Sequence, residues 1–164
     1  MFRVINIYSK SSNEIGRKLS NYSPHSFYLD GIAFSCFESF LQCIKFSDPE
    51  EQAAVSGMEA RAAKAKGSTR NWQSSGWLYW KGQPINRYSP EYRALLSRAY
   101  DALCENETFA DALCRSRGDL LIHSIGKLRK KATVLTTFEF IGMLTKKRRK
   151  LLRERRRKCE IKKI

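Results

Sequence analysis

The chain has 164 residues, of which 42% are hydrophobic, and its formal net charge is +15. This length suits one compact domain with a sizeable core. No apolar run approaches the ~18 residues of a membrane-spanning helix, and no secretory leader is apparent, so no membrane partner is expected. The five cysteines are odd in number and lack C-x-x-C spacing. This pattern argues against a disulfide framework or a zinc site and favours reduced thiols in a cytoplasmic protein.

Two turn signals organise the first third of the chain. Residues 2–8 are β-prone and predict a short strand. The dipeptide Asp30-Gly31 predicts a hairpin over residues 27–34, because Asp-Gly supplies the positive φ angles of a type I′ turn. The spacing Ser35-x-x-Glu38 matches a capping box, which predicts a helix from about 36 to 46.

Helix signals dominate the rest of the chain. Further helices are predicted from capping residues, prolines in a first turn and glycine stops. They begin at Asp48-Pro49, continue over Ala60–Lys66 until Gly67, run from Ser89 to about Cys104 and from Asn106 to about Arg115, and begin again at Thr136-x-x-Glu139. Residues 68–88 are the least regular part, and residues 119–125 are expected to be extended. The predicted fold class is mainly α: a multihelical single domain with a few short β-strands near the N-terminus.

The positive charge is concentrated at the carboxyl end. Residues 146–163 hold twelve Lys/Arg and two Glu, a net of +10, which leaves +5 for the rest (15 − 10). The apolar stripe of the last helix ends at Leu152, so we divide the chain into a domain over 1–150 and a basic tail over 151–164. A basic tail favours polyanions such as nucleic acid through counterion release. Its other interpretation is a solvated helix end.

The helix predicted over 36–46 carries an acid, an amide and an amine on one face. Glu38, Gln42 and Lys45 stand at i, i+4 and i+7 among apolar neighbours. Polar groups in such surroundings must be paired or kept for chemistry. Two turns separate Glu38 from Lys45, about 10 Å, so both can face one cleft. Glu38 can instead complete the capping box, and Gln42 can be a satisfied core amide.

Lys45 is the strongest candidate for chemistry, because lysine is rarely buried without a partner. A desolvated amine has a lowered pKa and becomes a nucleophile toward a carbonyl carbon. An opened ribose exposes an aldehyde at C1, where Lys45 can form a Schiff base. Lys45 can alternatively hold a phosphate as a point charge, pair with Glu38, or extend along the surface to solvent.

Several motifs, in this order and spacing, resemble the NADAR family (NAD- and ADP-ribose-associated, YbiA-like). They are Leu19-Ser-Asn-Tyr22, Leu29-Asp-Gly31, Glu38-Ser-Phe-Leu-Gln-Cys-Ile-Lys-Phe46, Arg70-Asn-Trp72, Phe109-x-x-x-Leu113, Gly118-Asp119 and Thr133-Val-Leu-Thr-x-x-Glu139-Phe. The resemblance extends over roughly residues 5–150 and implies a YbiA-like helical domain.

The resemblance also implies an N-glycosidase that hydrolyses the bond between a base and ribose and needs neither a cofactor nor a metal. Its substrate would be an ADP-ribosyl conjugate, such as ADP-ribosylated guanine in DNA or a free nucleotide, or a phosphoribosylamino intermediate of riboflavin biosynthesis. Lys45 and Glu38 would be catalytic. The substrate-binding residues by position would be Asn21, Asp30, Gly31, Gln42, Trp72 and Asp119. The rival interpretation is a non-catalytic module that binds ADP-ribose or nucleic acid and uses the basic tail.

The chain departs from the family pattern at His123, where many relatives have a glutamate followed shortly by a Trp-Gly pair. His123 is itself a candidate substrate contact, because imidazole titrates near neutrality. Trp72 can stack on a base or pack in the core. The Asp30-Gly31 turn fits a structural role as well as a binding role.

Overall fold

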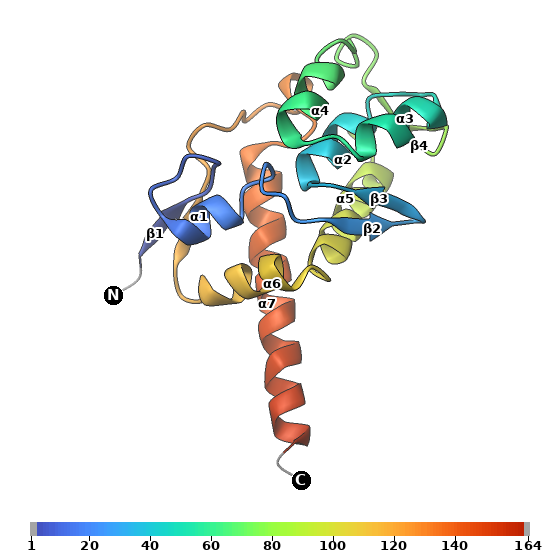
Figure 1. The fold of residues 1–164 in the computed structure, drawn as a ribbon. Helices are drawn as coiled ribbons and strands as arrows, with labels where there is room; N and C mark the ends of the chain where they lie inside the picture. The colour runs from blue at the N-terminus through green and yellow to red at the C-terminus, as the bar shows by residue number, and fades with distance from the viewer. Residues whose placement is uncertain (1–2, 163–164) are drawn as a thin grey trace.

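A computed structural model describes residues 3–162 as a helix-rich mixed α/β fold (Figure 1). The α-helices are α1 (Glu14–Lys18), α2 (Phe37–Cys43), α3 (Pro49–Ser56), α4 (Ala60–Gly67), α5 (Pro90–Leu103), α6 (Glu107–Arg115) and α7 (Thr137–Ile161). The strands are β1 (Val4–Asn6), β2 (Phe27–Leu29), β3 (Ile32–Phe34), β4 (Trp77–Trp80), β5 (Gln83–Asn86) and β6 (Leu120–Ile122). They pair as β1-β6 in parallel and as the antiparallel hairpins β2-β3 and β4-β5. The strands are therefore spread along the chain, and the prediction that they cluster near the N-terminus is too narrow.

An aromatic ladder joins three helices at the centre of the domain. The inner face of α5 is fully buried, with Tyr92, Leu96 and Tyr100 each at 0% exposure. Phe37 of α2 stacks on Tyr100 with ring centroids 4.0 Å apart, and Tyr100 stacks on Phe140 of α7 at 6.4 Å. Offset aromatic stacking adds to the area that these rings bury. The ladder holds the start of α7 in a constant relation to α2.

The two hairpins show what a turn signal can and cannot reveal. The Asp30-Gly31 hairpin is confirmed, with both residues in the left-handed region at φ 50° and 82°. The hairpin β4-β5 lies inside residues 68–88, which the sequence marked as irregular. Its turn uses Lys81 and Gly82 at φ 49° and 79°, and lysine carries no turn signal. Pro84 lies within β5, and a proline inside a run argues against a strand.

The helix starts at Asp48, Ser89, Asn106 and Thr136 are confirmed, because each of these side chains accepts a backbone N–H. The capping box at Ser35-x-x-Glu38 is wrong. Cys36 is the N-cap of α2, and its N–H donates to Ser39 Oγ at 3.4 Å. Glu38 therefore has no capping role. The predicted helix end at residue 46 is also too late: α2 ends at Cys43, and Lys45 lies in the turn that follows.

The last helix, α7, is one continuous element that begins at the confirmed Thr136/Glu139 capping box. Its 25 residues correspond to about 37 Å of helix. Phe140 and Leu144 pack on the core, whereas every side chain from 153 to 162 is exposed and the helix projects from the domain (Figure 1). The division predicted at residue 150 thus falls inside α7. Although α7 is long, neither it nor any other helix of residues 3–162 is apolar enough to cross a membrane.

Candidate active site

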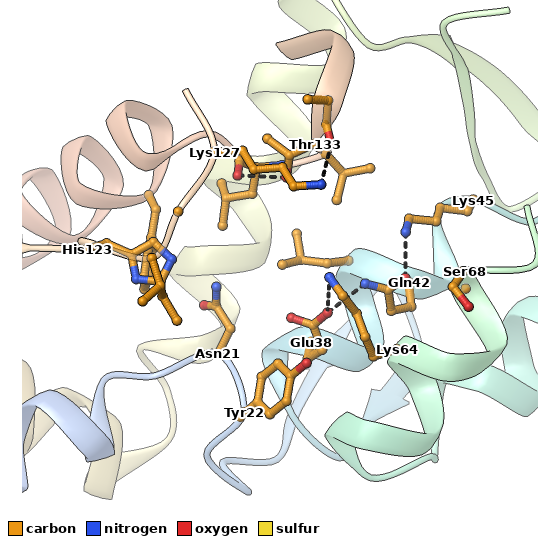
Figure 2. A pocket seen from close by; sticks show the side chains of 18 of the residues that line it. Asn21, Tyr22, Glu38, Gln42, Lys45, Lys64, Ser68, His123, Lys127 and Thr133 are labelled. Carbon is orange, nitrogen blue, oxygen red and sulfur yellow. Dashed lines mark hydrogen bonds and ion pairs between the residues drawn. The ribbon is translucent and has the colours of Figure 1, made fainter. Parts of the chain in front are cut away.

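A cavity of about 860 Å³ lies between α2, α4 and the start of α7. One wall consists of α2, the turn after it, the end of α4 and residues 68–73. The opposite wall is the segment 123–135 together with Phe140, so that His123 and Lys127 lie across the space from α2 (Figure 2). Six of the nine predicted site residues line this cavity: Asn21, Glu38, Gln42, Lys45, Trp72 and His123.

The α2 wall carries a hydrogen-bonded chain of three side chains (Figure 2). Lys45 Nζ donates to Gln42 Oε1 at 2.6 Å, and Gln42 Nε2 donates to Glu38 Oε1 at 2.6 Å. The same Glu38 oxygen lies 3.3 Å from Nζ of Lys64 on α4. Glu38 and Gln42 are 4% and 0% exposed. The buried amide thus orients both the carboxylate and the amine, which is how polar groups are satisfied in an apolar wall.

Lys45 differs from an ordinary paired lysine. In the described chain its amine has no carboxylate within 4.0 Å, because the Glu38 carboxylate is occupied by Lys64 and Gln42. Burial, together with repulsion from Lys64 and Lys127, lowers the pKa of Lys45 to about 8 against the attraction of Glu38. The alternative of a Lys45–Glu38 salt bridge is therefore wrong. A neutral, nucleophilic amine is accessible near neutral pH.

Gly67 closes the contact between α4 and α2. A Cβ atom added at Gly67 would lie 2.0 Å from Gln42 Oε1 and 2.9 Å from Gln42 Cβ. The backbone of α4 can approach the amide only because this residue has no side chain. Sequence reasoning identified Gly67 as a helix stop, and the structure adds that it holds Gln42 in place.

The opposite wall is positioned by the parallel β1-β6 pair. Ile7 N–H donates to Ile122 O at 2.8 Å, and His123 Nδ1 lies 2.6 Å from Ile7 O. A carbonyl can only accept, so we assign Nδ1 as the protonated nitrogen, which leaves Nε2 as the acceptor of a neutral ring. The ring of Phe140 meets His123 edge-on at 5.1 Å. Lys127 Nζ is held only by Ala132 O at 3.5 Å among the described atoms.

A buried ion pair anchors the segment 133–135 of this wall. Arg87 is 1% exposed and donates to both carboxylate oxygens of Glu139, at 3.0 and 2.7 Å. Its Nε donates to Thr133 O at 3.0 Å. Burial acts to raise the pKa of Glu139, but the hydrogen bonds from Arg87 and Thr136 outweigh it and leave the pKa below its ordinary value. Every strong donor and acceptor here is satisfied within the protein.

Three predicted substrate contacts lie outside the cavity lining. Asp30 accepts two hydrogen bonds from Arg98, at 2.7 and 2.9 Å, and Gly31 forms the hairpin turn with it. Asp119 accepts from Arg3 Nη2 at 2.9 Å. Asp30 and Asp119 thus have cationic protein partners, and none of the three residues is among those that line the cavity. Their contact with substrate stays a prediction, and in the structure Asp30 and Asp119 are held by Arg98 and Arg3.

Asn21 and Trp72 complete the predicted set. Asn21 O accepts the Glu38 N–H at 2.9 Å, and its side-chain Oδ1 accepts from Tyr100 at 3.3 Å. Asn21, which lines the cavity, is therefore hydrogen-bonded to the start of α2. Trp72 lines the cavity but is only 4% exposed. Most of its ring packs in the core, which leaves little ring face for stacking on a base.

Sequence reasoning missed several cavity residues, among them Tyr22, Lys64, Arg70 and Lys127. Burial and the nearby Glu38 raise the pKa of Tyr22; its place in the Leu19–Tyr22 motif was an available signal. Lys64 and Lys127 resemble other surface lysines in sequence, and only the fold brings them to Lys45. Among the described lining residues, four are cations (Lys45, Lys64, Arg70 and Lys127) and one, Glu38, is an acid. This imbalance favours an anionic ligand.

Comparison with known proteins identifies the fold and the family of this chain. The fold is that of the Escherichia coli protein YbiA, whose NMR structure aligns with a TM-score of 0.66 at 17% identity, covering 94% of this chain and 89% of that chain. The YbiA-like fold expected from the motifs is thereby confirmed. A family model described as bacteriophage protein GP30.3 matches residues 14–149. The uncharacterized 17.1 kDa protein in the Gp30-rIII intergenic region of Enterobacteria phage T4 is 42% identical over 129 residues, 77% of this chain and 85% of the relative. The chain belongs to the GP30.3 family.

Proposed function

We propose that this chain is an N-glycosidase that hydrolyses the bond between a base and a phosphorylated ribose, in an ADP-ribosyl conjugate or a phosphoribosylamino compound. The observation that carries this proposal is the Lys45 amine. It lines the cavity, is bonded to a neutral amide rather than a carboxylate, and has a pKa of about 8. The excess of cations around it suits phosphate groups on the substrate.

In the first step, the neutral Lys45 amine attacks C1 of ribose and the C1–N bond to the base breaks. The proton displaced from Nζ passes through one bridging water to the Glu38 carboxylate, which delivers it to the leaving nitrogen of the base. The C1–O4 bond of the ribose ring then breaks, the second proton of Nζ passes to O4, and a Schiff base forms between Nζ and C1. Gln42 holds the amine and the carboxylate in register for both transfers, through its hydrogen bonds of 2.6 Å to each.

In the second step, water adds to C1 and gives a proton to Glu38. Glu38 passes this proton to Nζ, the C1–Nζ bond breaks as the remaining hydroxyl proton also moves to Nζ, and the free amine and the C1 aldehyde result. The net reaction consumes one water and releases the base and the ribose product. His123 faces this chemistry from the opposite wall (Figure 2) and is suited to accept a ribose hydroxyl proton through Nε2.

The first experiment measures the mass of the released base. Wild type and Lys45→Ala are incubated with ADP-ribosylated guanine in DNA and with free nucleotides. We expect Lys45→Ala to lose at least about 10³-fold in turnover, as when a nucleophile is removed. Lys66→Ala is the matched control, because Lys66 is exposed on α4 and does not line the cavity. Equal turnover by wild type and Lys45→Ala would refute the mechanism.

A second experiment separates a nucleophile from a phosphate-binding charge. Borohydride reduces a Schiff base to a stable amine, so turnover in its presence should leave a ribosyl adduct that peptide mapping locates at Lys45. Lys45→Arg keeps the positive charge but is not deprotonated in proteins. We expect it to bind substrate and fail to release base. Full activity of Lys45→Arg would assign Lys45 to phosphate binding instead.

The surplus of cations also favours one rival, a module that binds ADP-ribose without cleaving it. Under that alternative the cavity lysines Lys45, Lys64 and Lys127 serve only to hold phosphates. Calorimetry with ADP-ribose then shows binding in wild type, while no base is released from any conjugate tested. Release of base by wild type decides against this alternative.

A further inference from the structure

The part of α7 that follows Thr145 carries its charge in an ordered pattern. Six basic side chains form what we call the basic stripe: Lys146, Arg149, Lys150, Arg153, Arg156 and Arg157. At 100° per residue these positions fall within an arc of about 120°, and they extend over about 17 Å of helix. All six are exposed. The stripe is therefore a continuous line of charge along one face of a single helix.

The basic stripe faces away from the core. The residues through which α7 packs on the domain, Phe140, Leu144 and Leu151, lie on the opposite side of the helix by the same angular count. Figure 1 shows the C-terminal end of α7 standing clear of the other elements, and all side chains from 153 to 162 are exposed. A partner can approach the stripe without displacing any described part of the domain.

The protein itself neutralises little of this charge. Lys150 pairs with Asp101 at 3.0 Å, whereas the other five stripe residues have no carboxylate within 4.0 Å in residues 3–162. Glu160 follows the stripe by one turn and marks its end. Like charges at this spacing destabilise a helix, so an external polyanion that covers the stripe removes a cost as well as adding contacts.

The residue types along this part of α7 favour a nucleic acid over a membrane surface as the partner of the basic stripe. An amphipathic membrane helix needs a broad apolar face, and past Leu152 the described helix has one large apolar residue, Ile161. Four of the six stripe residues are arginines, whose planar fork binds phosphate oxygens in pairs. The diameter of a helix also matches the major groove of B-DNA.

We propose that the basic stripe of α7 is a docking surface for the phosphate backbone of double-stranded DNA. This site is separate from the cavity and does not depend on its chemistry. Contacts to phosphates position a protein without reading the base sequence. The stripe is therefore expected to bind duplexes of any sequence with similar affinity.

The test is fluorescence anisotropy with a labelled 20-base-pair duplex and the full chain at several salt concentrations. Five unneutralised cations predict a slope of log K against log salt of about −4.5 for wild type. Replacing Arg149, Arg153 and Arg156 by Gln should reduce the slope to about −2 and weaken binding at low salt by roughly tenfold or more. Lys45→Ala should bind the duplex as wild type does, so that failure here and failure of the glycosidase proposal are distinguished.

The matched control removes the same charge elsewhere. Lys10, Lys66 and Arg93 are exposed and lie outside α7, and their triple Gln variant should keep the wild-type salt slope. Circular dichroism verifies that both triple variants are folded. An equal loss in the control and stripe variants would overturn the proposal, as would binding to phosphatidylserine vesicles or polyglutamate with none to the duplex. Duplex RNA in parallel reports whether the partner must be DNA.

Discussion

One cluster of charge lies behind one wall of the cavity and a second lines its opposite wall, and the two are built differently. Arg87 and Glu139 neutralise each other in a bidentate pair, and the surrounding backbone satisfies their remaining groups. On the α2 wall, the single carboxylate of Glu38 faces two amines, Lys45 and Lys64, and an amide. The first cluster is complete within the protein, and the second carries an excess positive charge.

This difference teaches which charges support the fold and which are available to a ligand. A pair with matched charge and full hydrogen bonding has no free donor or acceptor for a substrate. Removing one partner leaves the other as an uncompensated buried charge. A cluster with surplus charge keeps one group in an unfavourable state, and the shifted pKa of Lys45 is its signature. Shifted pKa values of that kind concentrate at functional sites.

The largest expected effect on stability is that of Arg87→Met, which removes one partner of the complete cluster. Loss of the guanidinium leaves Glu139 buried without its partner, which should reduce the free energy of unfolding by about 3–5 kcal/mol. Urea denaturation measures the change. The double variant Arg87→Met/Glu139→Gln should recover part of the loss, because no charge is then stranded. A single variant as stable as wild type would show that the pair is not structural.

Gly67→Ala tests the contact between α4 and α2. The added Cβ would lie 2.0 Å from Gln42 Oε1, so the helices must separate or the amide must move, at a cost of about 1–3 kcal/mol. Displacing Gln42 also releases Lys45, and turnover should fall with stability. Gly57→Ala is the control, since its Cβ would meet nothing within 4 Å. If both variants behave alike, the approach at Gly67 is not required.

The third prediction concerns pH. The folded-state pKa of Lys45 is about 8 against an ordinary value of 10.5, so the unfolded chain binds more protons between these values. Wild-type stability should therefore rise with pH between about 8 and 10.5, relative to Lys45→Met, by at most about 1.4 kcal/mol per pH unit. Below pH 8 both states are protonated and the variant has its greatest relative advantage. Parallel stability curves for the two proteins would contradict the lowered pKa.

The same shift predicts the activity profile. The nucleophile is the neutral amine, so kcat/KM of the proposed glycosidase should rise with pH and level off above about 8. Lys127→Met removes a repelling cation, which should raise the pKa of Lys45 and displace the rising limb toward alkaline pH. A pH–rate series on both proteins measures this, and Lys130→Met serves as a control outside the cavity lining.

The smallest effect is expected at Asp30→Asn. The Asp30–Arg98 pair is largely exposed, with side chains 32% and 50% accessible, and such pairs contribute about 0–1 kcal/mol. Turnover should stay at the wild-type level, because Asp30 does not line the cavity. A large loss of turnover with normal stability would show that Asp30 takes part in substrate binding.

Sequence patterns predicted the elements whose signals are local. The Asp30-Gly31 turn, the caps at Ser89 and Asn106 and the Thr136/Glu139 box each depend on chemistry within four residues, and the structure confirms them. The capping box assigned to Glu38 failed because Cys36, a poor cap by composition, takes that position. Phe37 and Phe40 of α2 are buried in the core, and such tertiary packing cannot be read from a local capping pattern.

The site divides in the same way. The proximity of Glu38, Gln42 and Lys45 follows from their spacing in sequence, so the pattern could reveal it. Lys64, which pairs with Glu38, lies 26 residues from it in sequence (64 − 38). Lys127, which repels Lys45, lies 82 residues from it (127 − 45). Nothing in their local sequence distinguishes them from solvated lysines. The partners of Asp30 and Asp119 are equally remote in sequence, which is why these ion pairs were not apparent.

The continuity of α7 has a mechanical consequence. Thr137 and Phe140 belong to the cavity wall or border it, and the same unbroken helix carries Arg157 on its projecting end. Each residue inserted into this helix therefore rotates the part that follows it relative to the cavity. Inserting a single alanine after Leu152 would turn the distal charges by about 100° and advance them by about 1.5 Å. The direction in which the distal arginines point can thus be changed without altering any residue of the cavity.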